Sequence, residues 1–179
     1  NLPPEFELSC SYLFFYDKLE KSNYFLHLVN KFKSEPINSR MNSFIFGEPL
    51  SDGGNWNMIL NLVNKYGIVP KSNFQETSQT ENTGNIDDFL SNKLRDYAYS
   101  LRQINNEKEK TIFIENCLNE IYKILVIFIG EPPKQITWEY LNNGRYNTLY
   151  INFIVNYFSK YNRCWNISFG NSYFITGKF

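Results

Sequence analysis

The sequence predicts an α+β fold that is mostly helical, with one short hairpin and a strand near its C-terminal end. Three observations lead to this class. Several long segments place apolar residues at the spacing of one helix face. The turn-forming triplet Asn142-Asn143-Gly144 lies between two short aromatic runs, an arrangement typical of a hairpin. The last stretch of the chain looks extended and supplies the remaining strand.

The composition is that of a globular protein with an ample core. Of 179 residues, 42% are hydrophobic and 18% are aromatic, so one domain is expected. Basic and acidic residues number 18 each, which argues against a general surface for nucleic acid or anionic membrane. The most apolar run, 121–129, is interrupted by Lys123 and is too short to span a membrane.

The first elements follow from caps and helix breakers. A helix is expected from a Ser9 cap to about Phe32, where Glu35-Pro36 prevents its continuation. Met41 to Phe46 is expected to form a short helix or turn, and Pro49 to Gly54 a loop.

A short helix with a sharp end follows this loop. It ends at Tyr66, because Gly67 supplies a left-handed residue and Pro70 prevents resumption. Lys71 to Asn85 is rich in Ser, Thr, Asn and Gln, which predicts a polar surface loop. One face of the helix carries the apolar residues Trp56, Ile59, Leu60 and Val63.

Two longer helices are predicted next. One begins near Asn85, with Asp87 and Asp88 in its first turn and an apolar face of Leu90, Leu94, Tyr97 and Leu101. Glu107 to Lys110 reads as the solvated entry of a second, buried helix that ends at Gly130. The apolar positions of that helix are Ile114, Cys117, Leu118, Ile121, Leu125 and Phe128.

Thr137 to Tyr140 and Arg145-Tyr146 flank the expected hairpin turn at Asn142-Asn143-Gly144. Thr148 to Tyr161 is expected to return to helix.

Paired glycines at the start of a helix are the most informative motif. The segment Asp52-Gly53-Gly54-Asn55-Trp56-Asn57-Met58 is followed by Tyr66-Gly67-Ile68-Val69-Pro70-Lys71. Glycine lets another backbone approach closely, because no Cβ intervenes. The unit resembles the Gly-Gly substrate ledge of papain-type cysteine peptidases, and in this form the bleomycin hydrolase / aminopeptidase C family in particular.

Further segments are similar to the same family in the same order. They are Phe6-Glu7-Leu8-Ser9 with 11–21 and Asn23-Tyr24-Phe25-Leu26, then Gly130-Glu131-Pro132-Pro133, Thr137-Trp138-Glu139-Tyr140 and Gly170-Asn171-Ser172-Tyr173. The resemblance implies that residues 1–179 are a single partial domain of a papain-like fold, its helical part. It implies helical insertions at about 17–48 and 84–131.

The resemblance also implies an activity. Members of the family are cytoplasmic homohexamers that remove residues from peptide N-termini through a cysteine thiolate and an acyl-enzyme, without a metal or organic cofactor. Peptides and copies of the same chain are therefore the expected partners, in a cytoplasmic location. The balance of charge argues against nucleic acid as a partner.

By the same resemblance, Gly53, Gly54, Asn55 and Trp56 are the substrate-binding residues. The second glycine pairs its backbone with the substrate chain, and Asn55 and Trp56 border the pocket for the substrate's second residue. The alternative is that the glycines form only a tight turn before a helix. Asn55 and Asn57 replace the family's usual glutamine and aspartate, which changes the polarity of the pocket.

No catalytic residue is expected within the chain. The family's cysteine lies a couple of dozen residues before Phe6, and its histidine and asparagine lie far beyond Phe179, so the chain reads as an internal fragment or a truncated gene product. The chain alone is accordingly expected to be inactive. The competing hypothesis is a non-catalytic, helix-rich interaction protein or a decayed relic of such a peptidase.

None of the three cysteines is interpreted as catalytic. Arg163-Cys164-Trp165 reproduces the family's catalytic triplet, but no helix-forming run follows, so the match reads as a coincidence. Cys10 stands where the family usually has glutamine, and Cys117 is a small core residue. An odd number of cysteines without close pairs suggests a reducing cytoplasm.

The remaining polar candidates give no site. His27 is the only histidine, and its apolar helical surroundings favour a structural role over catalysis. A metal site has no support without a second histidine or a cluster of acids and cysteines. Glu48 and Asp52 are interpreted as solvated or capping carboxylates rather than as a catalytic pair.

The first helix is apolar around much of its circumference. Such a helix must be covered on several sides. In the family that the chain resembles, inserted helices help to join subunits, so part of this surface is predicted to form an oligomer contact, and the excised chain is predicted to expose a large apolar patch. The apolar residues of the helix are Tyr12, Phe15, Leu19, Tyr24, Phe25 and Leu28.

Overall fold

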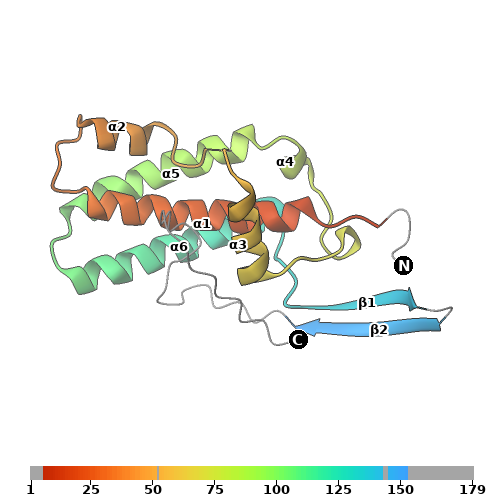
Figure 1. The fold of residues 1–179 in the computed structure, drawn as a ribbon. Helices are drawn as coiled ribbons and strands as arrows, with labels where there is room; N and C mark the ends of the chain where they lie inside the picture. Colours follow the sequence, from red (N-terminus) through yellow and green to blue (C-terminus); the bar gives the residue numbers. More distant parts are fainter. Residues whose placement is uncertain (1–5, 52, 143–144, 153–179) are drawn as a thin grey trace.

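The computed structural model describes residues 6–51, 53–142 and 145–152. In these ranges the chain is mostly helical and ends in a two-stranded antiparallel hairpin (Figure 1). Its elements are α1 (Cys10–Lys31), α2 (Arg40–Gly47), α3 (Trp56–Tyr66), the 3₁₀ turn η1 (Lys71–Asn73), α4 (Ser78–Glu81), α5 (Gly84–Gln103), α6 (Glu107–Ile129), β1 (Gln135–Asn142) and β2 (Arg145–Asn152).

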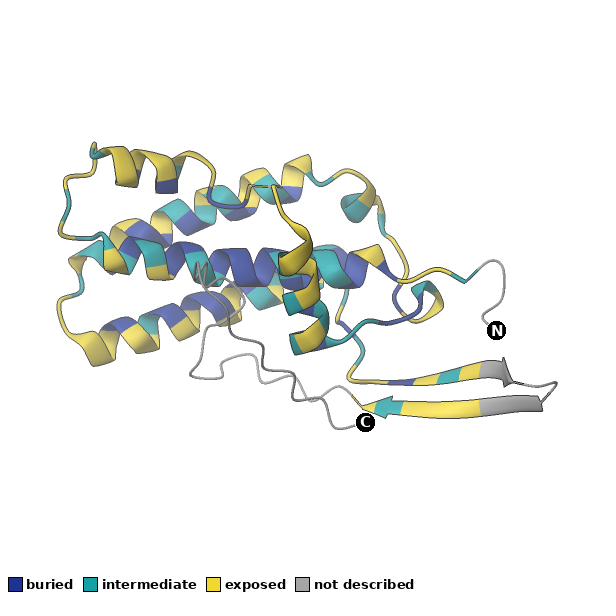
Figure 2. Cartoon of the chain, in the orientation of Figure 1, coloured by how far each residue is buried: buried dark blue, intermediate teal, exposed yellow. Residues whose placement is uncertain are grey.

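Helix α1 is the centre of the fold. Its first turn is capped by Ser9, whose Oγ accepts a hydrogen bond from the Tyr12 N–H at 3.1 Å, as predicted. Helices α6, α5, α3 and α2 all pack against it, and it carries buried residues along most of its length (Figures 1 and 2). This arrangement explains why its apolar residues surround the helix instead of forming one stripe.

The predicted exposure of the α1 apolar surface is wrong for four of its six residues. Tyr12, Phe15, Leu19 and Phe25 are buried by other elements of the same chain. Tyr24 and Leu28 are half-buried. The covering elements lie far along the sequence, so a helical pattern alone could not identify them.

The predicted positions of α5 and α6 are confirmed. Helix α5 buries the predicted face of Leu90, Leu94, Tyr97 and Leu101 against the core. Helix α6 is not buried all round, however, because Ile127 is 81% exposed. The prediction of a solvated entry to α6 holds for Glu107 but is wrong for Lys110, which is buried and ion-paired with Glu107.

Two glycines end helices with a left-handed backbone. Gly67 has φ 77° at the end of α3, as predicted, and its N–H donates to the Val63 carbonyl. Gly130 has φ 107° at the end of α6. Both positions turn the chain away from the helix axis, and the second directs it into the hairpin.

The hairpin is confirmed, but the helix predicted after it is wrong. Gln135 pairs with Asn152 and Ile136 with Ile151, so 148–152 are strand residues. Alternating β-branched and aromatic side chains here satisfy the strand period, and pairing with β1 outweighs the local helix signal. Residues 153–161 and the predicted C-terminal strand lie outside the described residues.

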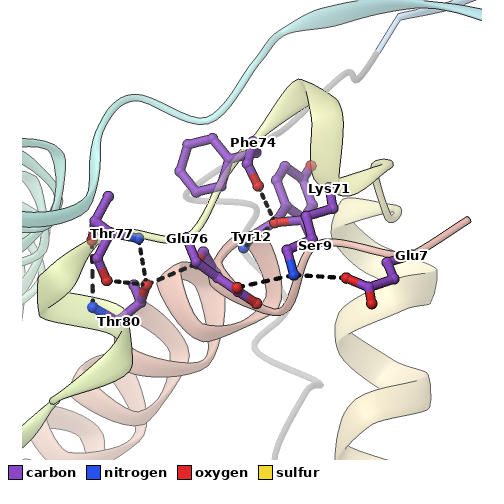
Figure 3. A network of polar contacts seen from close by, with 9 residues as sticks. Glu7, Ser9, Tyr12, Lys71, Phe74, Glu76, Thr77 and Thr80 are labelled. Atoms are coloured by element: carbon purple, nitrogen blue, oxygen red, sulfur yellow. Dashed lines mark hydrogen bonds and ion pairs between the residues drawn. The ribbon is translucent and has the colours of Figure 1, made fainter. Parts of the chain in front are cut away.

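The segment predicted as a polar surface loop is more ordered than expected. It contains η1 and α4, and Phe74 within it is buried. The Ser9 Oγ donates to the Phe74 carbonyl at 2.6 Å, and the Thr77 and Thr80 hydroxyls cap α4 reciprocally (Figure 3). Short local hydrogen bonds therefore fold a segment that lacks an apolar pattern.

Candidate functional site

Gly53 and Gly54, here called the glycine ledge, lie outside helix and strand, directly before the extended N-cap residue Asn55 of α3. Neither glycine has a left-handed φ, since Gly67 and Gly130 are the positive-φ glycines of the described residues. The Gly53 N–H donates to the Ser51 Oγ at 3.3 Å. This N–H···Oγ contact is that of an ST-turn, so the alternative that the glycines form only a tight turn before the helix is compatible with the structure.

Packing inside the chain does not require glycine at either position. A Cβ built on Gly54 would meet only the Met58 side chain, at 3.8 and 3.9 Å. A Cβ on Gly53 would meet the Ser51 Oγ at 3.4 Å. These are ordinary contacts, so nothing within the described residues explains two consecutive glycines on conformational or steric grounds.

The backbone of the ledge is available for pairing. Within the described part of the chain, no backbone hydrogen bond engages Gly54. Extended backbone with an unused N–H and C=O can accept another extended segment as a short antiparallel ladder. Pairing of a peptide with this backbone stays a prediction.

The two residues after the ledge begin α3. Asn55 is the N-cap, because its Oδ1 accepts a hydrogen bond from the Met58 N–H at 3.2 Å. The Asn55 N–H points to the Met58 Sδ at 3.3 Å, which closes a reciprocal cap. Trp56 is 70% exposed. Asn55 therefore uses its side chain to start the helix, while Trp56 remains accessible beside the ledge.

A groove between α1 and α3 borders one side of the ledge. It has a volume of about 530 Å³ and includes Gly54 in its lining. Its apolar wall consists of Leu13, Phe14, Trp56, Ile59 and Leu62. On α1, an ion pair between Lys21 and Asp17 at 2.7 Å lies at the same groove. The exposed stripe Trp56, Ile59 and Leu60 of α3 is the face predicted from the sequence, and the part of the chain described leaves it uncovered.

A second groove lies between α1 and α2 and reaches Gly53. Its volume is about 490 Å³, and Phe25, Leu28, Phe44 and Ile45 form most of its apolar lining. The two grooves have the ledge between them, since one is lined by Gly53 and the other by Gly54. An extended peptide on the ledge would find apolar surface on both sides.

A buried lysine lies behind the loop that leads to the ledge. The side chain of Lys18 is fully buried, and its Nζ lies 2.8 Å from the Asp87 carboxylate of α5. The same Nζ lies 3.4 Å from the Leu50 carbonyl and 5.0 Å from the centre of the Phe14 ring. A buried ammonium is tolerated here because these groups replace its hydration.

A buried glutamate holds the far end of α3. Glu20 is 3% exposed, and its carboxylate accepts from the Lys65 Nζ at 2.5 Å and from the Tyr66 hydroxyl. The Tyr12 hydroxyl donates to the Tyr66 carbonyl at 2.7 Å. Residues of α1 thus fix the C-terminal end of α3, and the N-terminal end of α3 directly follows the ledge.

Lys18, Glu20 and Tyr66 were not identified from the sequence. A signal was present, because charged residues that interrupt a helix apolar around its circumference must be buried with partners. The partners themselves, on α3 and α5, could not be deduced from spacing.

The other sequence candidates do not gather at the ledge. His27 is exposed on α1, and Glu48 is exposed before the ledge, while its suggested partner Asp52 lies outside the described residues. Cys10 is exposed in the groove between α1 and α3. The reading of Cys117 as a core residue is confirmed, and burial raises the pKa of its thiol to about 12. Cys164 and its triplet lie outside the described residues.

A further groove, of about 1020 Å³, lies elsewhere, between the N-terminal segment and β1. Lys71 lies in it between Glu7 at 2.6 Å and Glu76 at 3.1 Å (Figure 3). The hydrogen bond from Lys71 lowers the pKa of Glu7, and both acids raise the pKa of Lys71. Neither a cysteine nor a histidine is among its described lining residues, so it offers no nucleophile with a base.

The described residues contain neither a metal-binding group nor a membrane-spanning helix. No group of three or more His, Cys, Asp or Glu residues there could hold a metal ion. No helix among them has the length and apolar character needed to cross a membrane.

Comparison with known proteins supplies the context of this ledge. The sequence matches the Peptidase C1-like family over residues 3–170. It is 43% identical to aminopeptidase C of Listeria monocytogenes over 139 residues, which are 77% of this chain and 32% of that protein. It is 39% identical to bleomycin hydrolase of Gallus gallus over 142 residues, 76% of this chain and 31% of that protein.

A solved structure is similar in three dimensions. The crystal structure of PepW from Lactobacillus rhamnosis HN001 matches with a TM-score of 0.76 and 36% identity. The match covers 84% of this chain and 34% of PepW. The chain therefore spans about a third of the length of the relatives it matches.

Proposed function

Because this chain belongs to the Peptidase C1-like family, we propose that it is a portion of a cysteine aminopeptidase of the bleomycin hydrolase / aminopeptidase C type. Its papain-like fold and its relatives support a hydrolase that acts on peptide bonds. In the proposed reaction a cysteine thiolate attacks a peptide carbonyl near the N-terminus of the substrate, and water hydrolyses the acyl-enzyme. The catalytic cysteine, histidine and asparagine are proposed to lie outside residues 1–179.

This chain would contribute the binding surface for the substrate backbone. The observation that carries the proposal is that Gly53 and Gly54 have neither a left-handed φ nor a steric reason to be glycine. A peptide lying against Gly54 could use the free backbone N–H and C=O, while Trp56 would border the neighbouring pocket. Asn55 would act by setting the start of α3, since its side chain caps that helix.

The remaining properties follow from the family resemblance. The chain is proposed to be a single partial domain, 1–179, with helical insertions at about 17–48 and 84–131. The parent is proposed to be a cytoplasmic homohexamer whose partners are peptides and its own copies. A thiolate, an imidazole and an amide suffice for the chemistry, so no metal or organic cofactor is needed.

The test compares the isolated chain with a parent that carries the full catalytic set. The parent should hydrolyse aminoacyl-arylamides and lose this activity when its thiol is alkylated, whereas residues 1–179 alone should not turn the substrate over. Turnover by the isolated chain that disappears on Cys164→Ser would overturn both the fragment hypothesis and the dismissal of Cys164.

A second candidate function has one observation in its favour. The uncovered stripe Trp56, Ile59 and Leu60 would suit a helix-rich interaction protein. A flanking sequence without the catalytic residues, together with a stable monomeric chain, would favour that candidate or a decayed peptidase.

A further inference from the structure

The segment 46–50, from the end of α2 toward the ledge, is supported by α5 at two points. Arg95 donates from Nε to the Phe46 carbonyl at 3.1 Å and from Nη2 to the Gly47 carbonyl at 3.0 Å. Asp87, two turns earlier on α5, holds the Lys18 ammonium that faces the Leu50 carbonyl. Three carbonyls in the segment 46–50 therefore face cations that α5 supplies or supports.

Lys18 differs from Arg95 because its ammonium is buried, so a change in its position would cost free energy. Its side chain has no exposure, and that of Asp87 is 20% exposed. An ammonium withdrawn from water keeps only the hydrogen-bond acceptors around it, so it holds them strongly in place. Leu50 itself is 5% exposed and Pro49 is buried, so the loop has little freedom next to Lys18.

We propose that Lys18 is a positioning residue for the peptide-binding ledge, and that Asp87 of α5 sets its position. Substrate pairs with backbone at Gly53 and Gly54, three and four residues beyond the carbonyl that Lys18 contacts. A small displacement of Leu50 displaces that backbone, and peptide pairing is sensitive to such displacements. Helix α5 thereby acts on substrate binding without touching substrate. This inference rests on the proposed function of the ledge.

The test uses Lys18→Met in the full parent enzyme. The KM for a peptide substrate should rise by about tenfold, because the loop loses its support, while thiol alkylation keeps its rate. Lys18→Met also leaves Asp87 without its buried partner, which lowers stability on its own. The double variant Lys18→Met, Asp87→Leu removes both charges and should recover the melting temperature while the KM stays high.

A control lysine lies on α5, the helix that carries Asp87. Lys93 of α5 pairs with Glu120 of α6 at 2.7 Å and does not contact the loop, so Lys93→Met should leave the KM unchanged. A KM that returns to the wild-type value in the double variant would show that Lys18 serves stability alone, and would overturn the proposal. An unchanged KM in Lys18→Met would overturn it as well.

Hydrogen exchange separates this proposal from the proposed function. In both Lys18 variants the amides of 47–54 should exchange faster, and those of α6 should not change. If the unmodified parent hydrolyses no peptide, the proposed function fails, and the exchange rates still decide the role of Lys18. Unchanged exchange in 47–54 would contradict that role.

Discussion

The ring of Tyr66 lies parallel to the ring of Tyr16, with centroids 4.0 Å apart and 11° between the planes. The two residues join the last turn of α3 to the middle of α1. Tyr12 and Glu20 of α1 bind the carbonyl and the hydroxyl of the same residue. Tyr66 thus fixes α3, whose first residues border the ledge, through both its carbonyl and its side chain.

Removal of the Tyr66 hydroxyl should destabilise the chain. Tyr66→Phe keeps the stacked ring but leaves the buried Glu20 with one hydrogen-bond donor fewer, which should lower the free energy of unfolding by about 1–3 kcal/mol. Urea unfolding measures this change. Tyr99 is 73% exposed, so Tyr99→Phe is the matched control and should have an effect within about 0.5 kcal/mol. Equal effects of the two variants would show that the hydroxyl is unimportant.

Substitution of Gly54 should separate stability from binding. A methyl group fits at this position, so Gly54→Ala should unfold at nearly the same urea concentration as the unmodified chain. Gly54→Val in the parent enzyme should place a branched side chain where the substrate backbone lies, and turnover of peptides should fall while the thiol remains alkylatable. Gly84→Ala, whose added Cβ would meet only the Asn82 Oδ1 at 3.8 Å, is the control. Unchanged turnover in Gly54→Val would exclude the ledge from substrate binding.

The two described cysteines should differ in reactivity. Burial and the neighbouring charge of Glu120 raise the pKa of Cys117 to about 12, so at neutral pH its thiol stays protonated and inaccessible. Cys10 is exposed. Iodoacetamide followed by peptide mass spectrometry should therefore label Cys10 in the native chain and Cys117 only after denaturation. Rapid labelling of native Cys117 would contradict its place in the core.

Glu120 should give a pH-dependent contribution to stability. The hydrogen bond from Lys93 is the main cause that lowers the pKa of Glu120 in the folded chain. The contribution is therefore present above the unfolded-state pKa, about 4.3, and is lost as the pH falls through the lower folded-state pKa. Glu120→Gln should cost under about 1 kcal/mol at neutral pH, because the pair is partly solvated. Urea titrations at neutral and acidic pH should show this cost disappear in acid; a constant cost would refute the assignment.

The isolated chain should self-associate through α3. Trp56, Ile59 and Leu60 form an exposed apolar stripe, and exposed apolar area favours association. Sedimentation velocity should show species larger than the monomer, and Ile59→Glu should shift them toward monomer. Ile127→Glu, at an equally apolar exposed residue of α6, is the control and should have a smaller effect. A sharp monomer with cooperative unfolding would contradict this prediction.

The helices were predictable because each has its own local signal. Ser9 and Asn55 are caps, Gly67 and Gly130 end helices, and α5 repeats its apolar face at the helical period. The error at 148–152 arose because that run is equally compatible with a strand, and pairing with β1 decided the outcome. The local sequence indicated the hairpin turn but not how far the pairing extends.

Gly53, Gly54, Asn55 and Trp56 could be proposed from the sequence because they are consecutive and carry a family resemblance. Their role in binding substrate stays a prediction. The support for the ledge comes from Lys18 and Asp87, which meet only because α1 and α5 pack together. Contacts between distant segments require a fold before they can be recognised.

The central position of α1 has a consequence for synthesis of the chain. The helices that cover it, α5 and α6, end at residues 103 and 129, whereas α1 ends at residue 31. At the usual speed of a ribosome, roughly 5 to 20 s separate the translation of α1 from that of the last residues that bury it. During this interval its aromatic side chains, and the Lys18 that later pairs with Asp87, lack their native partners. The nascent chain is therefore expected to need a chaperone that binds aromatic helical segments until α6 has emerged.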